Sequence, residues 1–80
     1  MSITVNLYAA ARQAAQQSSF TTEAASLSEV KIELIREFPK LASVISQCSF
    51  IVDGHSYGIS GDCELTSGQG IDVMPPFSGG

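Results

Sequence analysis

The residues best suited to chemistry are the last six, Pro75-Pro76-Phe77-Ser78-Gly79-Gly80. A chain ending in Gly-Gly offers a terminal carboxylate with no Cβ near it, and such a tail is thin enough to enter another protein's active site. Pro75 and Pro76 end any preceding strand and stiffen the base of the tail. We therefore expect the reactive group to be the Gly80 carboxylate, which is presented to a partner and not held in a pocket of this chain.

The other tail residues have expected roles in the same scheme. Gly79 permits threading, because a residue without a side chain passes close to a ligand and adopts positive φ without strain. Ser78 and Phe77 form the expected partner-contact segment, with Phe77 as an exposed anchor and not a core residue. Because residues 77–80 span at most about 13–14 Å when extended, the partner's chemistry must lie within that distance of the folded body.

Other side chains that could take part in chemistry or binding carry weaker functional signals. Cys48, His55 and Cys63 match no zinc-ligand spacing and lack a fourth ligand. No Cys–His pairing is visible either, so we expect reduced thiols and no metal site. Arg12 either orients a partner or is a solvated helix residue. Met74, on the expected outer face of the last strand, either contacts a partner or is an isolated exposed apolar residue.

Length and composition exclude several functional classes. The chain has 80 residues, a net charge of −4 and four basic residues that form no run, which argues against nucleic-acid binding. No stretch has the length of a membrane span and no secretory signal is visible, so we expect a cytoplasmic protein that does not bind membranes. One small domain over residues 1–74, followed by a functional tail over 75–80, leaves little room for a small-molecule active site. Asp62 and Glu64 are expected to be ordinary loop charges.

A strand, a short helix and a second strand are expected to open the fold. Apolar and polar side chains alternate over residues 2–8, which predicts a half-buried strand. Residues 9–17 are rich in Ala and Gln with no β-branched residue, which favours a short helix. Residues 20–24 are the second strand candidate.

The strongest helical signal covers residues 27–37. Ser26 and Glu29 fit a capping box, with Ser26 as the N-cap and Glu29 reaching back from the third helical position. Apolar residues then recur at helical spacing. Pro39 ends the helix, because the residue before a proline avoids the α-helical region. A shorter second helical piece is expected over residues 41–45.

The C-terminal half contains three further strand signals. Residues 50–52 form a short apolar run, Asp53-Gly54 is a turn dipeptide, and Tyr57 and Ile59 suggest a short returning strand. Alternation over residues 71–74 predicts the last strand. The order indicates an α+β fold, the ubiquitin-like β-grasp: a mixed sheet of about four to five strands on one main helix. In that fold the first and last strands lie parallel in the middle of the sheet, and the C-terminus leaves as a free tail.

These segments resemble the small, sulfur-carrying subunit of molybdopterin synthase (the MoaD family) over essentially the whole chain. Leu7-Tyr8-Ala9-Ala10-Ala11-Arg12 resembles the family's opening segment, and Ser26-Leu27-Ser28-Glu29 resembles its helix start. Leu65 with Gly68 is similar to its approach to the last strand. The tail is similar to the family's Pro-Pro-Val-Ser/Thr-Gly-Gly ending, which is the specific part of the match.

The resemblance implies a cycle of activation and sulfur transfer. An adenylyltransferase of the ubiquitin-activating type uses ATP and Mg²⁺ to adenylate the Gly80 carboxylate, and a sulfur donor converts the adenylate to a thiocarboxylate. The loaded tail enters the large subunit of molybdopterin synthase, within a heterotetramer, and gives sulfur to a cyclic pyranopterin precursor of the molybdenum cofactor. This chain is expected to bind no cofactor itself. The implied partner contacts are Arg12, Met74, Pro75, Pro76 and Phe77.

Some positions depart from the family pattern, and other functions stay open. Gln13, Gln69 and Gly70 stand where acidic residues are common, and Asp53 stands where Asn is frequent. These departures lie outside the tail and bear on partner contacts. The open alternatives are a sulfur carrier for thiamine thiazole or cysteine synthesis, a ubiquitin-like modifier that forms isopeptide bonds, and an interaction domain with an inert terminus.

Overall fold

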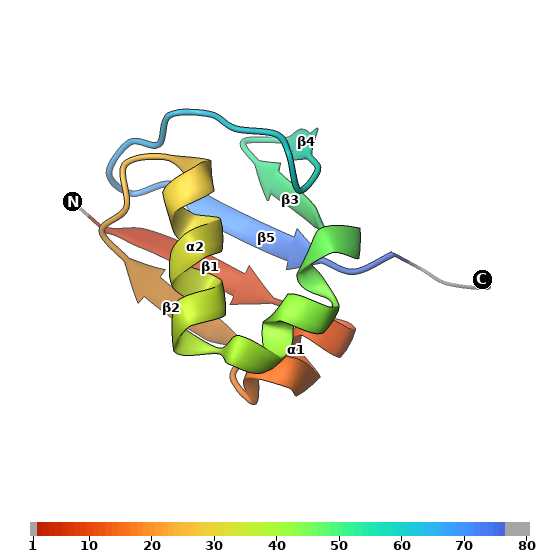
Figure 1. Cartoon of the computed structure of the whole chain (residues 1–80). Helices are drawn as coiled ribbons and strands as arrows, with labels where there is room; N and C mark the ends of the chain where they lie inside the picture. Colours follow the sequence, from red (N-terminus) through yellow and green to blue (C-terminus); the bar gives the residue numbers. More distant parts are fainter. Residues whose placement is uncertain (1, 77–80) are drawn as a thin grey trace.

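The computed structural model describes residues 2–76; Met1 and residues 77–80 lie outside the described residues. Within this part the chain forms five strands, two α-helices and two 3₁₀ helices (Figure 1). In chain order they are β1 (Ile3–Leu7), α1 (Ala9–Ala15), β2 (Ser19–Thr22), α2 (Leu27–Glu37), η1 (Pro39–Ser43), η2 (Ile45–Gln47), β3 (Ser49–Val52), β4 (His55–Tyr57) and β5 (Gly70–Met74).

The strands form one mixed sheet in the order β2-β1-β5-β3-β4. β1 and β5 run parallel, with Val5 opposite Ile71 and Leu7 opposite Val73. The other neighbouring pairs in the sheet are antiparallel. The last strand of the chain is therefore the central strand of the sheet, as Figure 1 shows. The predicted order, with the first and last strands parallel in the middle, is confirmed.

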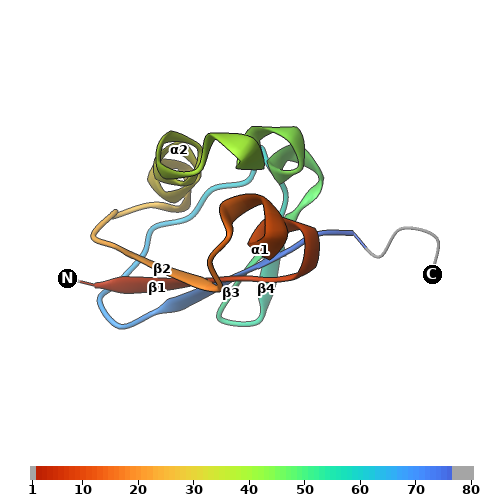
Figure 2. The ribbon, with the colours of Figure 1, turned by 90° about the horizontal axis from the view of Figure 1, so that it is seen from below.

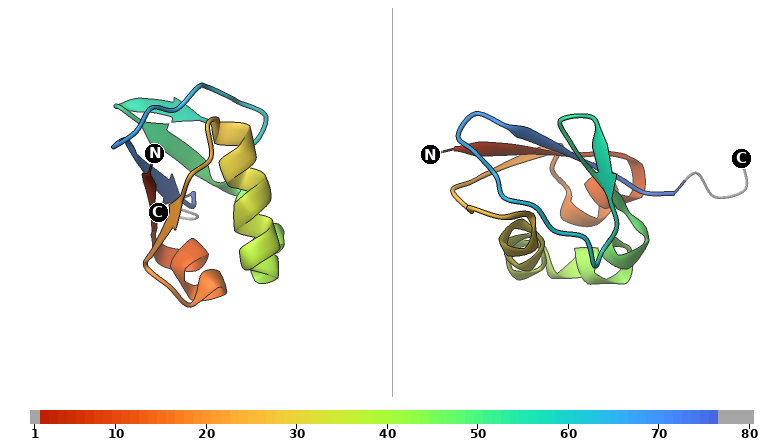
Figure 3. Two further views of the ribbon diagram at one scale, coloured as in Figure 1. Left: turned by 90° about the vertical axis from the view of Figure 1, so that its left-hand side faces the viewer. Right: turned by 90° about the horizontal axis from the view of Figure 1, so that it is seen from above.

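The core lies between the sheet and α2, which covers one face of it (Figure 2). Because alternate side chains of a strand point to the same face, β1, β3 and β5 each direct every second residue toward the helix. α1 lies on the same face of the sheet and packs against η1 and β5, near the ends of β1 and β5 (Figure 3). The largest fully buried side chains are Phe50, Ile3, Leu7, Leu27, Leu34, Leu41, Ile71, Val5, Val30 and Val73.

The predicted bounds of α2 are confirmed. Its buried residues Leu27, Val30 and Leu34 recur at helical spacing on the face toward the sheet. The helix ends at Glu37, and its C-cap Phe38, immediately before Pro39, donates its N–H to the Leu34 carbonyl at 2.8 Å. The proline restricts the residue before it, which is why the helix stops there.

Several predicted elements differ in extent or type from the observed ones. β2, predicted over residues 20–24, covers Ser19–Thr22. α1 stops at Ala15, because Gln16 turns left-handed with φ 60°. The piece over residues 41–45 is not α-helical: it consists of the two 3₁₀ helices, the first of which starts at Pro39. β4 ends at Tyr57, so Ile59 lies outside the strand and is exposed. In each case the backbone turns before the sequence pattern that predicts the helix or strand has ended.

The predicted turn between β3 and β4 is confirmed. Asp53 and Gly54 both have positive φ, 51° and 80°. Two left-handed residues in succession form the turn whose twist matches a tight antiparallel hairpin. The aspartate tolerates this conformation better than most side chains, and the glycine has none to clash.

Candidate functional site at the end of the central strand

The tail leaves the fold from the most enclosed strand of the sheet. β5 is paired with β1 up to Val73 and with β3 up to its last residue, Met74, which lies opposite Ser49. On the other side the Tyr8 N–H donates to the Val73 carbonyl at 3.3 Å. Pro75 is half-buried and Pro76 is exposed. Since neither proline has an N–H to donate, the ladder ends at this point, as predicted.

The reactive residue and its nearest neighbours fall on Phe77, Ser78, Gly79 and Gly80, which lie outside the described residues. Their predicted roles as anchor, threading segment and reactive carboxylate therefore stay predictions. The structure describes the base from which they start. That base is the end of the central strand, on the side of the molecule away from Ser2, because β1 and β5 run in the same direction.

A polar cluster lies on the uncovered face of the sheet just before the exit. Asp72 accepts hydrogen bonds from the Asn6 side-chain amide at 3.1 Å and from the Tyr8 hydroxyl at 3.2 Å. The pKa of Tyr8 is raised, first by the negative charge of Asp72, then by burial and by the hydrogen bond between them. Tyr8 is 39% exposed, so this ordered cluster is accessible from solvent. The sequence pattern identified none of these contacts.

Two predicted contact residues lie on β5 and on the helix that packs against it. Met74 shares the outer face with Asp72 and is half-buried, whereas Ile71 and Val73 face the core, as the alternation predicted. Arg12 is an exposed residue of α1, the helix that packs against β5. The structure thus places both residues on elements next to the base of the tail.

A second organised region is the loop over residues 58–62, which follows the edge strand β4, two strands away from β5 in the sheet. The Lys31 ammonium donates to the carbonyls of Gly58 and Ile59, each at 2.9 Å, and also to that of Gly61. The side chain is only 6% exposed, and its nitrogen lies 5.0 Å from the centre of the Phe50 ring. Burial lowers the pKa of Lys31, against the smaller opposing effect of Asp62. Lys31 therefore ties a loop without regular structure to α2.

Asp62, predicted to be an ordinary loop charge, caps α2 from a distant part of the chain. Its Oδ1 accepts hydrogen bonds from the backbone N–H groups of Ser28 and of the next residue, Cys63, both at 2.9 Å. These bonds favour the carboxylate, and the Ser28 bond is the largest cause of its lowered pKa. A negative charge at a helix N-terminus also complements the helix dipole. The prediction for Asp62 was wrong because the partners are 34 residues apart in the chain.

The predicted capping box is present in an altered form. Ser26 is the N-cap, and its hydroxyl accepts from the Glu29 N–H at 3.3 Å. The Glu29 carboxylate accepts from the Ala25 N–H at 3.0 Å, one residue before the expected position. Ser26 itself forms an isolated β-bridge with Glu64, which joins the start of α2 to the segment between β4 and β5.

The cysteines and the histidine do not form a common site. Cys48 is buried, its thiol donates to the Val44 carbonyl at 3.3 Å, and burial raises its pKa. Cys63 is half-buried and His55 is exposed on the edge strand β4. Among residues 2–76 no group of three His, Cys, Asp or Glu side chains is placed to hold a metal ion. We also find no helix in this part of the chain with the length and apolarity to cross a membrane.

Two positions that depart from the family pattern contact each other. The Gln69 side-chain amide donates to the Asp53 carboxylate at 2.5 Å, and its oxygen accepts from the Thr66 N–H at 2.7 Å. Gln69 thereby connects the β3–β4 turn with the turn that precedes β5. This contact lies at the surface, at the end of β5 opposite to the tail.

Comparison with known proteins identifies the fold through structure and not through sequence. No family model and no curated protein matches the chain. The structure is similar to that of SAMP1 from Haloferax volcanii, with a TM-score of 0.82, 18% identity and complete coverage of both chains. It is also similar to a putative molybdopterin converting factor subunit 1 from Pyrococcus furiosus, with a TM-score of 0.80 and 20% identity over 95% of this chain and 98% of that one.

A third similar structure is a complex of subunits 1 and 2 of the molybdopterin-converting factor from Helicobacter pylori, with a TM-score of 0.72, 21% identity and complete coverage of both chains. At such identities the likeness establishes the fold. The chain is a ubiquitin-like β-grasp, with a mixed sheet packed on one main helix, as predicted.

Proposed function

We propose that this chain is a ubiquitin-like sulfur carrier, the small subunit of a molybdopterin synthase in the cytoplasm. The observation that supports it best is the exit of a Pro-Pro-Phe-Ser-Gly-Gly tail from the end of the central strand. The ladders of β5 continue to Val73 on the β1 side and to Met74 on the β3 side, so the base of the tail has a defined position and direction. A terminus presented in this way suits delivery of one reactive group to several partners.

The chemistry proceeds at the Gly80 carboxylate. A carboxylate oxygen attacks the α-phosphate of ATP on an adenylating partner, diphosphate leaves, and the acyl carbon gains AMP as a leaving group. Without this step nucleophilic attack on the acyl carbon is disfavoured, because it would add charge to an anion. A sulfur nucleophile then displaces AMP and leaves a thiocarboxylate. Its soft, ionised sulfur is the nucleophile that the large subunit directs to the pyranopterin precursor.

The uncovered face near the exit is the proposed docking surface for the large subunit. Met74 and the Asn6–Tyr8–Asp72 cluster lie on it, and Arg12 lies on the adjacent helix. Pro75 and Pro76, the first two residues of the tail, stand in the sequence between this surface and residues 77–80. An ordered polar cluster beside an apolar side chain is the composition expected at the edge of a specific interface.

Mass spectrometry of the intact protein tests the proposal. Incubation with an adenylating enzyme, ATP, Mg²⁺ and a sulfur source should raise the mass by about 16 Da, the difference between sulfur and oxygen. A variant lacking Gly80 serves as the control and should gain nothing. An unchanged mass of the full chain, or equal modification of the shortened one, would falsify the carrier proposal.

The similarity to SAMP1, the small archaeal modifier protein 1, favours one further function, that of a protein modifier. That function predicts isopeptide conjugates of high mass on a denaturing gel, which disappear when Gly80 is deleted. Carriers for thiamine thiazole or cysteine synthesis would load sulfur equally well. They would bind a different large partner, and co-purification with the pyranopterin-binding large subunit distinguishes them from our proposal.

A further inference from the structure

One edge of the sheet carries backbone groups that are available for pairing. β2 is the first strand in the sheet order and has a neighbour only on the β1 side. The Leu7 N–H donates to the Ser18 carbonyl at 2.9 Å. Because antiparallel pairs alternate, Phe20 and Thr22 also direct their backbone groups toward β1, whereas Ser19 and Thr21 direct theirs to the open edge.

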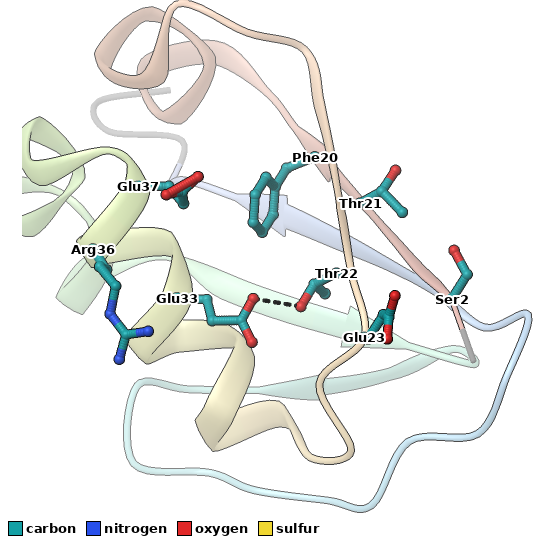
Figure 4. Close-up of a pocket in the computed structure, with 8 residues that line it drawn as sticks. All are labelled: Ser2, Phe20, Thr21, Thr22, Glu23, Glu33, Arg36 and Glu37. Carbon is teal, nitrogen blue, oxygen red and sulfur yellow. Dashed lines mark hydrogen bonds between the residues drawn. The ribbon is translucent and has the colours of Figure 1, made fainter.

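A groove of about 360 Å³ runs between this edge and α2, as Figure 4 shows. The half-buried Phe20 ring lies in it and packs edge-on against Phe38, with the ring centres 5.5 Å apart. The Thr22 hydroxyl donates to the Glu33 carboxylate at 2.6 Å, which ties the strand to the helix across the groove. The groove therefore has an apolar side chain within it and an ordered wall.

The charge of the lining indicates the chemistry of an occupant. Glu23, Glu33 and Glu37 line the groove together with a single cation, Arg36. A second copy of this chain on the same edge would bring equal sets of carboxylates face to face, and each copy has a net charge of −4. Charge complementarity instead selects a basic segment.

We propose that this groove binds an extended, basic segment of a partner protein, which adds to β2 as a sixth strand. The segment places an apolar side chain against Phe20, and lysine or arginine residues two positions away on each side face Glu33 and Glu37. The backbone of Thr21 pairs with the added strand, in the manner of strand addition at other exposed sheet edges. This site does not involve the tail, so it is independent of the sulfur-carrier proposal.

A synthetic peptide probes the site directly. The probe is a blocked heptapeptide, Thr-Lys-Thr-Val-Thr-Lys-Thr, whose lysines and valine share one face of a strand. In an amide NMR titration at low salt it should shift the signals of β2 and α2. Replacing both lysines by glutamate should abolish these shifts. Shifts elsewhere, or equal binding of the glutamate peptide, would overturn the proposal.

Methylation of peptide nitrogens tests the strand geometry without altering the protein. In an added strand alternate N–H groups face β2, so methylating the valine nitrogen and methylating that of the next threonine should have opposite outcomes. One change should weaken binding at least tenfold, and the other should leave it within about twofold, a difference of at least about fivefold or about 1 kcal/mol. Equal effects of the two would exclude strand addition.

Protein variants complete the test. Thr21→Pro removes an open-edge N–H and should abolish probe binding, whereas Thr21→Val keeps the N–H and should bind as the wild type does. Glu37→Lys should weaken binding at least fivefold, and Glu64→Lys, an equal charge change outside the groove, should weaken it less than twofold. Deleting Gly80 should change nothing. A concentration-dependent dimer that Thr21→Pro removes would show that a second copy occupies the edge and would overturn the proposal.

Discussion

The end of β5 and the loop over residues 58–62 are held in place in opposite ways. β5 is held by backbone ladders on both sides, to β1 and to β3. The loop has no regular secondary structure, and side chains hold it: Lys31 binds three of its carbonyls, and Asp62 binds the start of α2. The first region presents the proposed reactive tail, and the second completes the fold.

Because of this difference, we expect function and stability to depend on different residues of the chain. The described part of the tail, Pro75 and Pro76, follows the last ladder residue and is not among the residues of the described core. Changes there should remove function and leave the folded body intact. The loop contacts buried groups and follows β4, which is separated from β5 by β3. Changes there should lower stability and leave the loading of the terminus intact wherever the protein is still folded.

The largest effect is expected at Gly79. Replacing it with valine puts a branched side chain into the segment that must pass close to two active sites, and misplacement of a reacting group typically costs about 100-fold in rate. We expect sulfur loading to fall by that order, with no change in Tm. Ser60→Val, an exposed loop change, is the matched control and should load normally. Normal loading of the Gly79 variant would remove the threading role assigned to the tail.

Next in size is the loss of the Lys31 contacts. Lys31→Met keeps the apolar stem but leaves three carbonyls without their donor, which should lower the free energy of unfolding by about 1–3 kcal/mol. Lys40→Met, at an exposed lysine, should stay within about 0.5 kcal/mol of the wild type. Urea unfolding measures both. Equal stability of the two variants would show that the loop is held by other contacts.

A smaller, pH-dependent effect is expected at Asp62. Its pKa is lowered from 3.8 in the folded state, so the folded protein binds this proton less readily than the unfolded chain. The carboxylate of Asp62 therefore stabilises the fold fully at a pH above its pKa in the unfolded chain. This contribution is lost as the pH falls through its pKa in the folded protein. The Tm difference between wild type and Asp62→Asn should shrink between about pH 5 and pH 3. A constant Tm difference for Asp62→Asn over this pH range would contradict the capping role.

The smallest effect on stability is expected in the cluster at the exit. The negative charge of Asp72 raises the pKa of Tyr8, so Asp72→Asn should lower it, with little change in Tm. Tyr57→Phe provides the background for an ultraviolet titration, because Tyr8 is then the remaining tyrosine. A Tyr8 pKa that does not move would mean that the two side chains do not interact in solution.

Much of the fold could be predicted because the signals are local. The bounds of α2 follow from its apolar spacing and from Pro39, and the turn at Asp53 and Gly54 follows from residues that tolerate positive φ. The last strand follows from its alternation, apart from its first residue, Gly70. Less predictable were the ends of α1 and β4. There a single left-handed residue or a loop turn overrides a continuing side-chain pattern.

By itself the sequence determined the order of the elements, the faces of the strands and the prolines that end the last ladder, because each depends on residues close together in the chain. Tertiary structure alone decided the roles of Lys31, Asp62 and Asp72. Their partners are 27 to 30, 34, and 64 to 66 residues away, respectively. A lysine or an aspartate looks the same in a sequence whether it is solvated or buried against carbonyls and amides. Only the folded chain brings those groups within hydrogen-bonding distance.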